Sequence, residues 1–380
     1  MNSNMSIYTT LLTLESLDIS PSYIIPVFMF GTLTYCAILF FNVTLLLIIA
    51  LNQKLHKPMY ILLFNMPIND IVGATAFFPQ LISSILSQNR SITYSACYMQ
   101  AFLVHLYGSG TLLILSAMAY DRYIAICCPL KYNTIMSPNS VLKIIIAIWS
   151  IAFTVISFLL ALSYRQEVCS TKIVDTFCNN PSLMKLICGD ISLTNYYGLS
   201  LTALYQIITL FIILFTYIQI LITCVFKRHS DAKSKAIQTC STHLIVFLCI
   251  EFSGLFAIIS HRFENVSQYL RRLFGASVMI FPPFINPLIY GLKTKEIKHI
   301  LFCSVKKYLA YLNTIEHLWD VLNERPSAFP FWLPALCWTW NEKSCNERNH
   351  LVICALASLA LAIHCRGVWS VTRVKCHPAR

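Results

Sequence analysis

The sequence predicts an all-α membrane protein: a bundle of seven transmembrane helices, with the N-terminus outside and a short amphipathic helix after the seventh span. Composition is the first reason. The 380 residues are 57% hydrophobic and 12% charged, with a mean hydropathy of +0.65, more than one water-soluble core can bury. Length is the second reason, because apolar stretches of ~20 residues or more, enough to span ~30 Å of hydrocarbon, recur along the chain. The seven stretches cover residues 24–51, 58–87, 97–127, 141–163, 196–226, 236–260 and 271–292.

Basic residues set the expected orientation, because Lys and Arg beside a span stay on the cytoplasmic side. The N-terminal segment carries Glu15 and Asp18 but neither Lys nor Arg, whereas the first loop carries Lys54 and Lys57. The later inner segments contain Lys131, Lys143, Lys227, Arg228, Lys233, Lys235, Lys293, Lys295, Lys298, Lys306 and Lys307. Three arginines of an outer loop are exceptions: Arg262, Arg271 and Arg272. The net charge of +12 therefore mostly coats the inner membrane face and does not indicate a nucleic-acid partner.

Two covalent modifications are predicted on the outer side. Disulfides persist only in oxidising compartments, so Cys97 at the start of the third span and the three cysteines of the loop before the fifth are expected to form two bridges. Those three are Cys169, Cys178 and Cys188, and their positions alone leave the pairing open. The sequon at Asn4, in the outer tail, is predicted to carry a glycan. The remaining cysteines in or below the bilayer are interpreted as small packing residues.

The third span ends in MAYDRYIAICCPLKY, Met118 to Tyr132, which puts a charged pair at the membrane edge. From Cys97 to Arg122 is 25 residues. As a helix this is ~37 Å, about one bilayer thickness plus a margin. An ion pair between Asp121 and Arg122 at the inner end can hold a cytoplasmic surface shut until another group accepts the arginine. The alternative is an interfacial arginine that only snorkels.

Four segments, in this order and spacing, resemble the rhodopsin-like G-protein-coupled receptors and, more narrowly, the olfactory receptor family. The resemblance runs from about residue 20 to 305. The segments are LHKPMYILLFNMPINDI (Leu55 to Ile71, similar to the first loop and second helix), MAYDRYIAICCPLKY (the third-helix end), KAIQTCSTHL (Lys235 to Leu244, the sixth-helix start) and PPFINPLIYGLKTKEI (Pro282 to Ile297, the seventh-helix end).

The resemblance implies an odorant receptor of the plasma membrane. It would bind a small organic ligand in the outer half of the bundle and activate a heterotrimeric G protein of the stimulatory olfactory type, raising cAMP. Residues 1–23 would form the extracellular tail, 24–305 the receptor domain and 306–380 an atypical extension. The alternatives are a non-olfactory amine or peptide receptor, or a seven-span transporter or channel, which should show inverted repeats or interrupted helices. An enzyme is disfavoured, because no nucleophile and base occur together at a suitable spacing.

Individual roles follow from the resemblance where residues match. Arg122 resembles the arginine that is released on activation, and Tyr217 and Tyr290 resemble the tyrosines that receive it. The full activation and coupling set is Asp121, Arg122, Tyr123, Tyr217, Asn286, Pro287 and Tyr290. Asn42, Asp70 and Asn286 match positions that line a sodium site in the wider superfamily, so sodium is the one ion expected and no other cofactor. The family's bridges would be Cys97–Cys178 and Cys169–Cys188.

A ligand pocket is predicted from depth along two helices. His105 lies 17 residues before Arg122, and Glu251 lies 16 after Lys235. Each therefore sits ~25 Å above the cytoplasmic side. His105 shares a helix face with Ser109, as Val104 does with Gly108, by i, i+4 spacing. The predicted pocket residues are Val104, His105, Gly108, Ser109, Tyr205, Glu251, Leu255, Ile258 and Met279, of which Tyr205 and Met279 rest on the resemblance.

Glu251 departs from the family, which commonly has a tyrosine at the matching position. A carboxylate at this depth would pair with a cationic ligand, which predicts a bias toward amines. Alternatively, Glu251 is protonated, since burial disfavours the ionised form, or it bonds to a neighbouring helix. His105, on an apolar face, likewise has a structural alternative.

The C-terminal extension does not fit a receptor. YLNTIEHLWDVLNERP, Tyr311 to Pro326, resembles the end of a mariner-type transposase, where the matching glutamate is a metal-binding carboxylate. The partner aspartates are lacking, so no two-metal nuclease can be assembled. We interpret the stretch as transposon-derived sequence appended to the receptor, or as an artefact of the gene structure.

Overall fold

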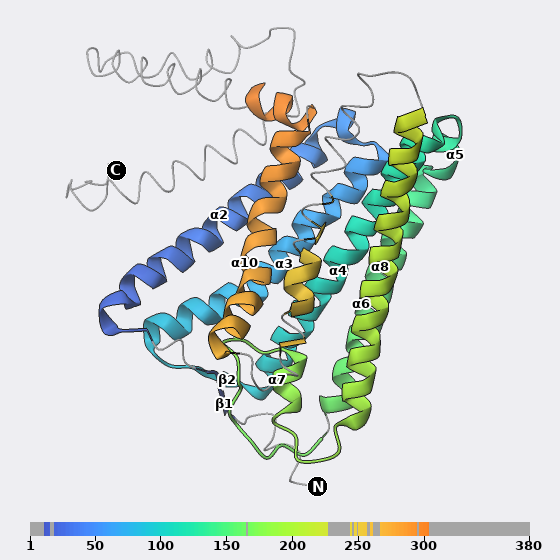
Figure 1. Cartoon of the computed structure of the whole chain (residues 1–380). Coiled ribbons are helices and arrows are strands. Elements are labelled where there is room, and N and C mark those ends of the chain that lie inside the picture. The colour runs from blue at the N-terminus through green and yellow to red at the C-terminus, as the bar shows by residue number, and fades with distance from the viewer. Residues whose placement is uncertain are drawn as a thin grey trace, which may run out of the picture. The chain divides into compact units, whose positions relative to one another are not determined.

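The computed structural model describes residues 11–15, 19–164, 166–226, 267–294 and 296–303, together with 244, 247–248, 250–256 and 259–260. Six helices of this part are long and apolar enough to cross a membrane (Figure 1). They are α2 (Ile24–Leu51), α3 (Pro58–Ser87), α4 (Tyr94–Cys127), α6 (Pro138–Tyr164), α8 (Ser192–Phe226) and α10 (Gln268–Lys293). Six of the seven predicted spans are thus confirmed to within a few residues. The other, 236–260, falls largely outside the described residues.

The chain divides into two compact units. The larger one comprises Met1–Leu46 and Lys57–Tyr290, and the smaller one Leu47–His56 and Gly291–Arg380. In the smaller unit, the Asn52 side chain donates to the Ile48 carbonyl at 2.6 Å where α2 ends, and residues 296–303 are helical. The short helices with assigned bounds in the described residues are η1 (Pro21–Tyr23), η2 (Gln53–Leu55), η3 (Pro129–Lys131), α5 (Tyr132–Ile135) and α7 (Asn180–Met184).

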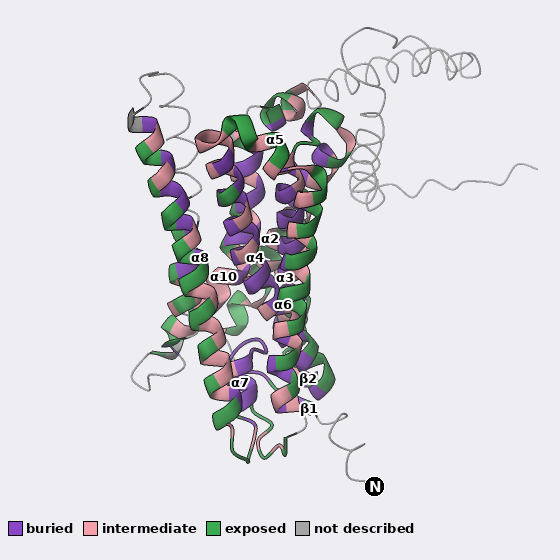
Figure 2. Ribbon diagram, turned by 90° about the vertical axis from the view of Figure 1, so that its right-hand side faces the viewer, coloured by how far each residue is buried: buried purple, intermediate pink, exposed green. Residues whose placement is uncertain are grey.

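Helices α3 and α4 form the interior of the larger unit. Their most apolar windows are each 61% buried, against 28% for α2 and α6 and 33% for α8 and α10. Helix α4 packs against α3, α6 and α8. On α8, large side chains such as Ile207 and Phe211 are 67% and 66% exposed, and Figure 2 shows green along that helix. Such an apolar outer surface fits a hydrocarbon solvent, so the four less buried helices are the lipid-facing ones.

Three prolines lie inside α10, and each removes one backbone N–H from the helix. Pro282 leaves the Val278 carbonyl without its helical donor, and the Tyr107 hydroxyl donates to that oxygen at 3.1 Å. Pro287 does the same to the Pro283 carbonyl, which accepts from the Asn42 side chain at 2.8 Å. Neighbouring helices therefore satisfy two carbonyls that would otherwise be unpaired in the membrane.

The end of the larger unit that carries the N-terminal segment also contains a small two-stranded sheet, beside the helices of the predicted all-α class. Strand β1 (Leu11–Thr13) pairs antiparallel with β2 (Ser91–Thr93), with Leu12 opposite Ile92. Leu12 and Leu14 are 0% and 2% exposed and pack in a cluster with Tyr94 and Ile173. Two bridges tie the same end, Cys97–Cys178 and Cys169–Cys188, with Cα atoms 5.3 Å apart in each.

Candidate functional site

A cavity of about 190 Å³ lies in the larger unit, between α4, α6, α8, α10 and the loop that joins α6 to α8. This volume is below the ~300–1,000 Å³ that is typical of pockets for drug-sized ligands. Six predicted pocket residues line it: Val104, His105, Gly108, Ser109, Tyr205 and Met279. Apolar side chains such as Leu112, Ile156 and Leu159 provide much of the remaining wall.

Gly108 contributes space to this cavity. A Cβ placed on Gly108 would meet no atom within 4 Å. The i, i+4 neighbours His105 and Ser109 flank it on α4, where the Ser109 hydroxyl donates back to the His105 carbonyl at 2.9 Å. The absence of a side chain at Gly108 therefore leaves room that a larger residue would fill.

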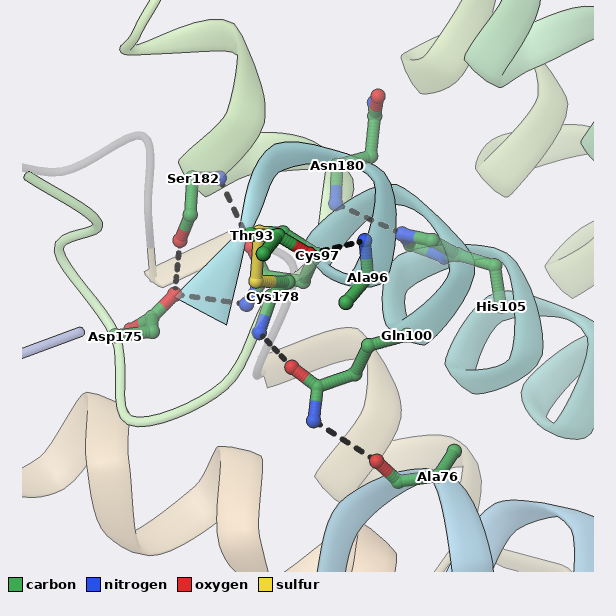
Figure 3. Close-up of a disulfide and its surroundings, with 11 residues drawn as sticks. Ala76, Thr93, Ala96, Cys97, Gln100, His105, Asp175, Cys178, Asn180 and Ser182 are labelled. Carbon is green, nitrogen blue, oxygen red and sulfur yellow. Dashed lines mark hydrogen bonds between the residues drawn. A yellow bond between two sulfur atoms is a disulfide. The ribbon is translucent and has the colours of Figure 1, made fainter. Parts of the chain in front are cut away.

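His105 ties the outer loop to α4 while it lines the cavity. Its Nε2 accepts a hydrogen bond at 3.0 Å from the backbone N–H of Asn180, the first residue of α7 (Figure 3). A ring nitrogen that accepts carries no proton, so the neutral ring has its hydrogen on Nδ1. His105 therefore has a structural role, since it bonds to the loop, and its side chain also lines the cavity.

The loop over the cavity is held by further polar contacts around the Cys97–Cys178 bridge, as Figure 3 shows. Gln100 accepts from the Cys178 backbone N–H and donates to the Ala76 carbonyl, each at 2.8 Å. The Asp175 carboxylate accepts from the side chains of Asn179 and Ser182, at 2.7 and 2.5 Å. These bonds hold the loop together and attach it to α3 and α4.

Glu251 is not one of the residues that line the cavity, although Ile250 and Gly254 beside it are. Its side chain is buried, with 8% of the residue exposed, and one carboxyl oxygen accepts from the Thr209 hydroxyl on α8 at 2.9 Å. The other oxygen is buried without a hydrogen-bond partner in the described part of the chain. This arrangement favours the helix-bonded alternative over direct pairing with a ligand.

Of the other two predicted pocket positions, one lies outside the lining and one lies outside the described residues. Leu255 is 38% exposed and lies outside it. Ile258 is outside the described residues, as are Asn4 with its predicted glycan and the transposase-like stretch. Depth along a helix fixes the height of a side chain but not which way the helix is turned, which is why Leu255 was misplaced.

Arg271 and Arg272 line the cavity, and the sequence reasoning did not place them there. Both lie near the start of α10, which begins at Gln268. From the sequence, the two arginines were assigned to the outer loop, at the edge of the predicted 271–292 span. Arg272 forms an ion pair with Glu15, with 3.7 Å between the guanidinium and carboxylate atoms. The signal that could have found both residues is that they break the positive-inside rule.

At the inner end of α4, Asp121 is 1% exposed and accepts a hydrogen bond from the Tyr132 hydroxyl at 2.9 Å. Asp121 and Arg122 make no direct ion-pair contact in the described part of the chain, although the Arg122 charge still acts on the Asp121 carboxylate. Consecutive residues of a helix do not face each other, which explains the difference. Burial, followed by the Asp121 charge and hydrogen bond, raises the pKa of Tyr132, so its hydroxyl remains a donor.

A second buried polar group lies between α2, α3 and α10. The Asn286 amide donates to both oxygens of Asp70, at 3.3 and 3.1 Å, and Asp70 is 0% exposed. The Asn42 amide donates to the carbonyls of Pro283 and Ile38, at 2.8 and 2.9 Å. Within the described ranges, the amide oxygens of Asn42 and Asn286 are buried and have no hydrogen-bond partner. One carboxylate and two amide oxygens are a donor set suited to a hard cation.

These features define the class of protein as a helical membrane protein. Helix α4 lines the cavity with its middle part and carries the Asp-Arg-Tyr triplet near its C-terminal end, so one helix connects the two regions. A profile of the olfactory receptor family matches residues 31–308. The chain is 33% identical to olfactory receptor 52B2 of Homo sapiens over 269 residues, which is 70% of this chain and 83% of that receptor. It is 34% identical to human olfactory receptor 52H1 over 259 residues, or 68% and 82% of the two chains. Against olfactory receptor 6E1 of Mus musculus the values are 29% over 289 residues, 76% and 92%.

The chain therefore belongs to the olfactory receptor family, and it is a multi-pass membrane protein. Membership implies a receptor with odorant ligands and G-protein coupling, and not an enzyme.

Proposed function

We propose that the protein is an odorant receptor of the plasma membrane that binds a small organic ligand in the outer cavity. It activates a heterotrimeric G protein of the stimulatory olfactory type and so raises cAMP. The N-terminal tail, 1–23, is extracellular, the segment 236–260 completes a seven-helix receptor domain over 24–305, and residues 296–303 form a short amphipathic helix at the inner membrane surface. The observation that carries the proposal is that six predicted ligand residues line one small cavity in a chain of this family.

Helix α10 is the element that connects ligand to signal. Val278 and Met279 line the cavity, and Asn286 and Tyr290 lie further along the same helix. Between them, Pro282 and Pro287 break the helical hydrogen bonding, and side chains of other helices hold the freed carbonyls. A ligand that presses on Met279 acts next to the first of these points. A helix softened there can bend and move its inner end.

At the inner end lie the side chains that would receive the movement. Tyr217 and Tyr290 are both buried, each with 5% of the residue exposed. Arg122 is adjacent to Asp121, which the Tyr132 hydroxyl holds. In the proposed active state Arg122 turns toward the two tyrosines and the helices separate, so that a G-protein helix enters the opened groove.

A sodium ion would be held by Asp70, Asn42 and Asn286 in the inactive state. The carboxylate supplies the charge, and the unpaired amide oxygens supply neutral ligands. Bound there, the ion would stabilise the present positions of α2, α3 and α10. Thr111, which stands where many family members have a glutamate, instead accepts from the Asn69 amide at 2.8 Å and ties α4 to α3.

The cavity proposal is tested by filling it. Gly108→Leu places a side chain in the open space beside Gly108, so odorant-evoked cAMP in transfected cells should be lost while surface expression is kept. The matched control is Ala203→Leu, which introduces the same leucine side chain at an exposed position of α8 and should respond as the wild type does. An undiminished response of Gly108→Leu to every agonist of the wild type would refute the assignment of this cavity. A receptor truncated after Cys303, tested alongside, should signal normally.

A further inference from the structure

His105 has a hydrogen-bond donor that the described part of the protein does not use. Its Nε2 accepts from the backbone N–H of Asn180, so the ring is neutral and carries its hydrogen on Nδ1. This Nδ1–H donates to no described residue. His105 lines the cavity and is only partly buried, whereas its neighbours Val104 and Leu106 on α4 are buried. The bond to the loop therefore fixes the ring as a donor at the cavity wall.

The wall that α8 provides carries a second unused group. Tyr205 lines the cavity, and its hydroxyl is buried and makes no hydrogen bond within the described ranges. Two other hydroxyls of the lining differ from it. Ser109 donates its hydrogen to the His105 carbonyl at 2.9 Å, and the Thr202 hydroxyl donates to a carbonyl of its own helix at 2.8 Å. A hydroxyl has one hydrogen, so Ser109 and Thr202 can only accept from a ligand, whereas Tyr205 can donate.

Two further polar atoms of the lining are buried without a hydrogen-bond partner in the residues that the structure describes. They are Nε of Arg271 on α10, which is a donor, and Oδ1 of Asn180, which is an acceptor. Unused donors thus come from three walls of the cavity, α4, α8 and α10. A buried donor without a partner costs free energy, so a ligand with an oxygen acceptor is favoured over a hydrocarbon of the same shape. A carbonyl oxygen suits these donors, because it accepts two hydrogen bonds and brings no hydrogen that needs an acceptor.

We propose that the cavity selects small carbonyl compounds, such as ketones, aldehydes and esters, and that the Nδ1–H of His105 donates to the ligand oxygen. Tyr205 supplies a second donor from α8, and the apolar lining receives the hydrocarbon part of the ligand. His105 is the specificity-determining residue, because the Asn180 N–H occupies Nε2 and leaves the ring no lone pair for a ligand donor. This inference rests on the proposed function in taking the cavity as the ligand site.

The test compares two probes of the same shape, cyclohexanone and methylenecyclohexane, in which a CH₂ group replaces the carbonyl oxygen. Both are titrated against the purified full-length receptor, and dissociation constants are taken from ligand-dependent shifts in Tm. His105→Phe should lower the ketone-to-alkene affinity ratio by about three- to tenfold, the effect of one hydrogen bond. The same variant loses the bond to the Asn180 N–H, but this loss affects both probes alike and cancels in the ratio.

Three further variants and one spectroscopic measurement complete the test. Tyr205→Phe should also lower the ratio, whereas Tyr196→Phe, at a 69% exposed position of α8 outside the lining, should leave it near the wild-type value. His105→Gln should retain most of the ratio, because an amide can accept from the Asn180 N–H and still donate to the ligand. In the wild-type receptor, the carbonyl stretching frequency of bound, isotope-labelled cyclohexanone should be lower than in hexane, because a hydrogen bond to the oxygen weakens the C=O bond.

Several results would overturn the inference. These are an unchanged ratio in His105→Phe, an equal fall in Tyr196→Phe, a bound carbonyl frequency equal to that in hexane, or no detectable binding of cyclohexanone to the wild type. If His105→Phe does not fold, Tyr205→Phe and the carbonyl frequency decide. Gly108→Leu should abolish binding of both probes. If both still bind to it, the cavity proposal fails, whatever His105 does.

Discussion

Tyr107→Phe isolates the hydrogen bond that holds α10 at its first internal proline. The Tyr107 hydroxyl donates to the Val278 carbonyl at 3.1 Å, an oxygen that Pro282 leaves without a helical donor. Phenylalanine keeps the ring, which is 1% exposed and lies so close to Gly73 that a Cβ there would be 2.5 Å from it. The substitution therefore removes one hydrogen bond and leaves the packing intact.

The magnitude follows from the environment of that carbonyl. An unsatisfied buried acceptor costs ~1–3 kcal/mol in soluble cores, whereas hydrogen bonds between transmembrane helices average ~0.6 kcal/mol. We expect a loss of ~1 kcal/mol, because no backbone N–H can replace the hydroxyl at a proline-freed carbonyl. A loss of ~1 kcal/mol lowers Tm by about 2–4 °C in a domain of roughly 150–250 residues, so we expect a shift of at most this size in the receptor.

The assay is thermal unfolding of the detergent-solubilised receptor, followed with a thiol-reactive dye. Tyr35→Phe is the matched control. Its hydroxyl meets the Thr75 hydroxyl at 3.2 Å, and Thr75 can donate instead to a carbonyl of its own helix, so this substitution leaves no proline-freed carbonyl unpaired. Tyr107→Phe should lower Tm by more than Tyr35→Phe does. Equal shifts in the two variants, or no shift in Tyr107→Phe, would refute the role of this bond in supporting α10.

Three further predictions concern the ligand, the inner end and the outer bridges. Glu251→Gln should change the potencies of amine and neutral agonists equally in a cAMP dose–response, because Glu251 bonds to Thr209 and lies outside the lining. A loss of potency of tenfold or more, ~1.4 kcal/mol, that is confined to amine agonists would instead establish the amine bias. Tyr132→Phe should raise basal cAMP, because Asp121 loses the hydroxyl that holds it, and basal cAMP at the wild-type level would argue against that contact as a restraint. Peptide mapping without reduction should recover Cys97 joined to Cys178, and a free thiol at Cys97 would contradict the structure.

The sequence predicts the membrane helices well, because their lengths follow from a single physical requirement. A span must cross the hydrocarbon as a helix, so the apolar stretches 24–51 and 58–87 have the same first and last residues as α2 and α3. The same regularity placed His105 and Ser109 on one face of α4, since spacing along a helix fixes relative direction. Strand β1 could not be found this way, because three residues take their pairing from β2 and the outer loop and not from local propensity.

The sequence could predict how far along a helix a site residue lies, but not the direction in which its side chain points. Glu251 has the expected depth, yet rotation of its helix directs it to Thr209 and puts Ile250 at the cavity. Asp121 and Arg122 make no direct contact, because neighbours on a helix diverge, although the Arg122 charge still acts on the Asp121 carboxylate. Arg272 was visible as an exception to an orientation rule, but its contact with Glu15 joins segments far apart in sequence and needed the fold.

Arg122→Ala gives the most direct test of the central claim, that a ligand in the outer cavity activates a G protein through the inner end of α4. Agonist binding to the purified variant and agonist-evoked cAMP in cells with matched surface expression are measured for the same ligand. The account predicts that binding is retained and cAMP is lost, because Arg122 does not line the cavity and its release opens the inner groove. Agonist-evoked cAMP at the wild-type level in Arg122→Ala would contradict it.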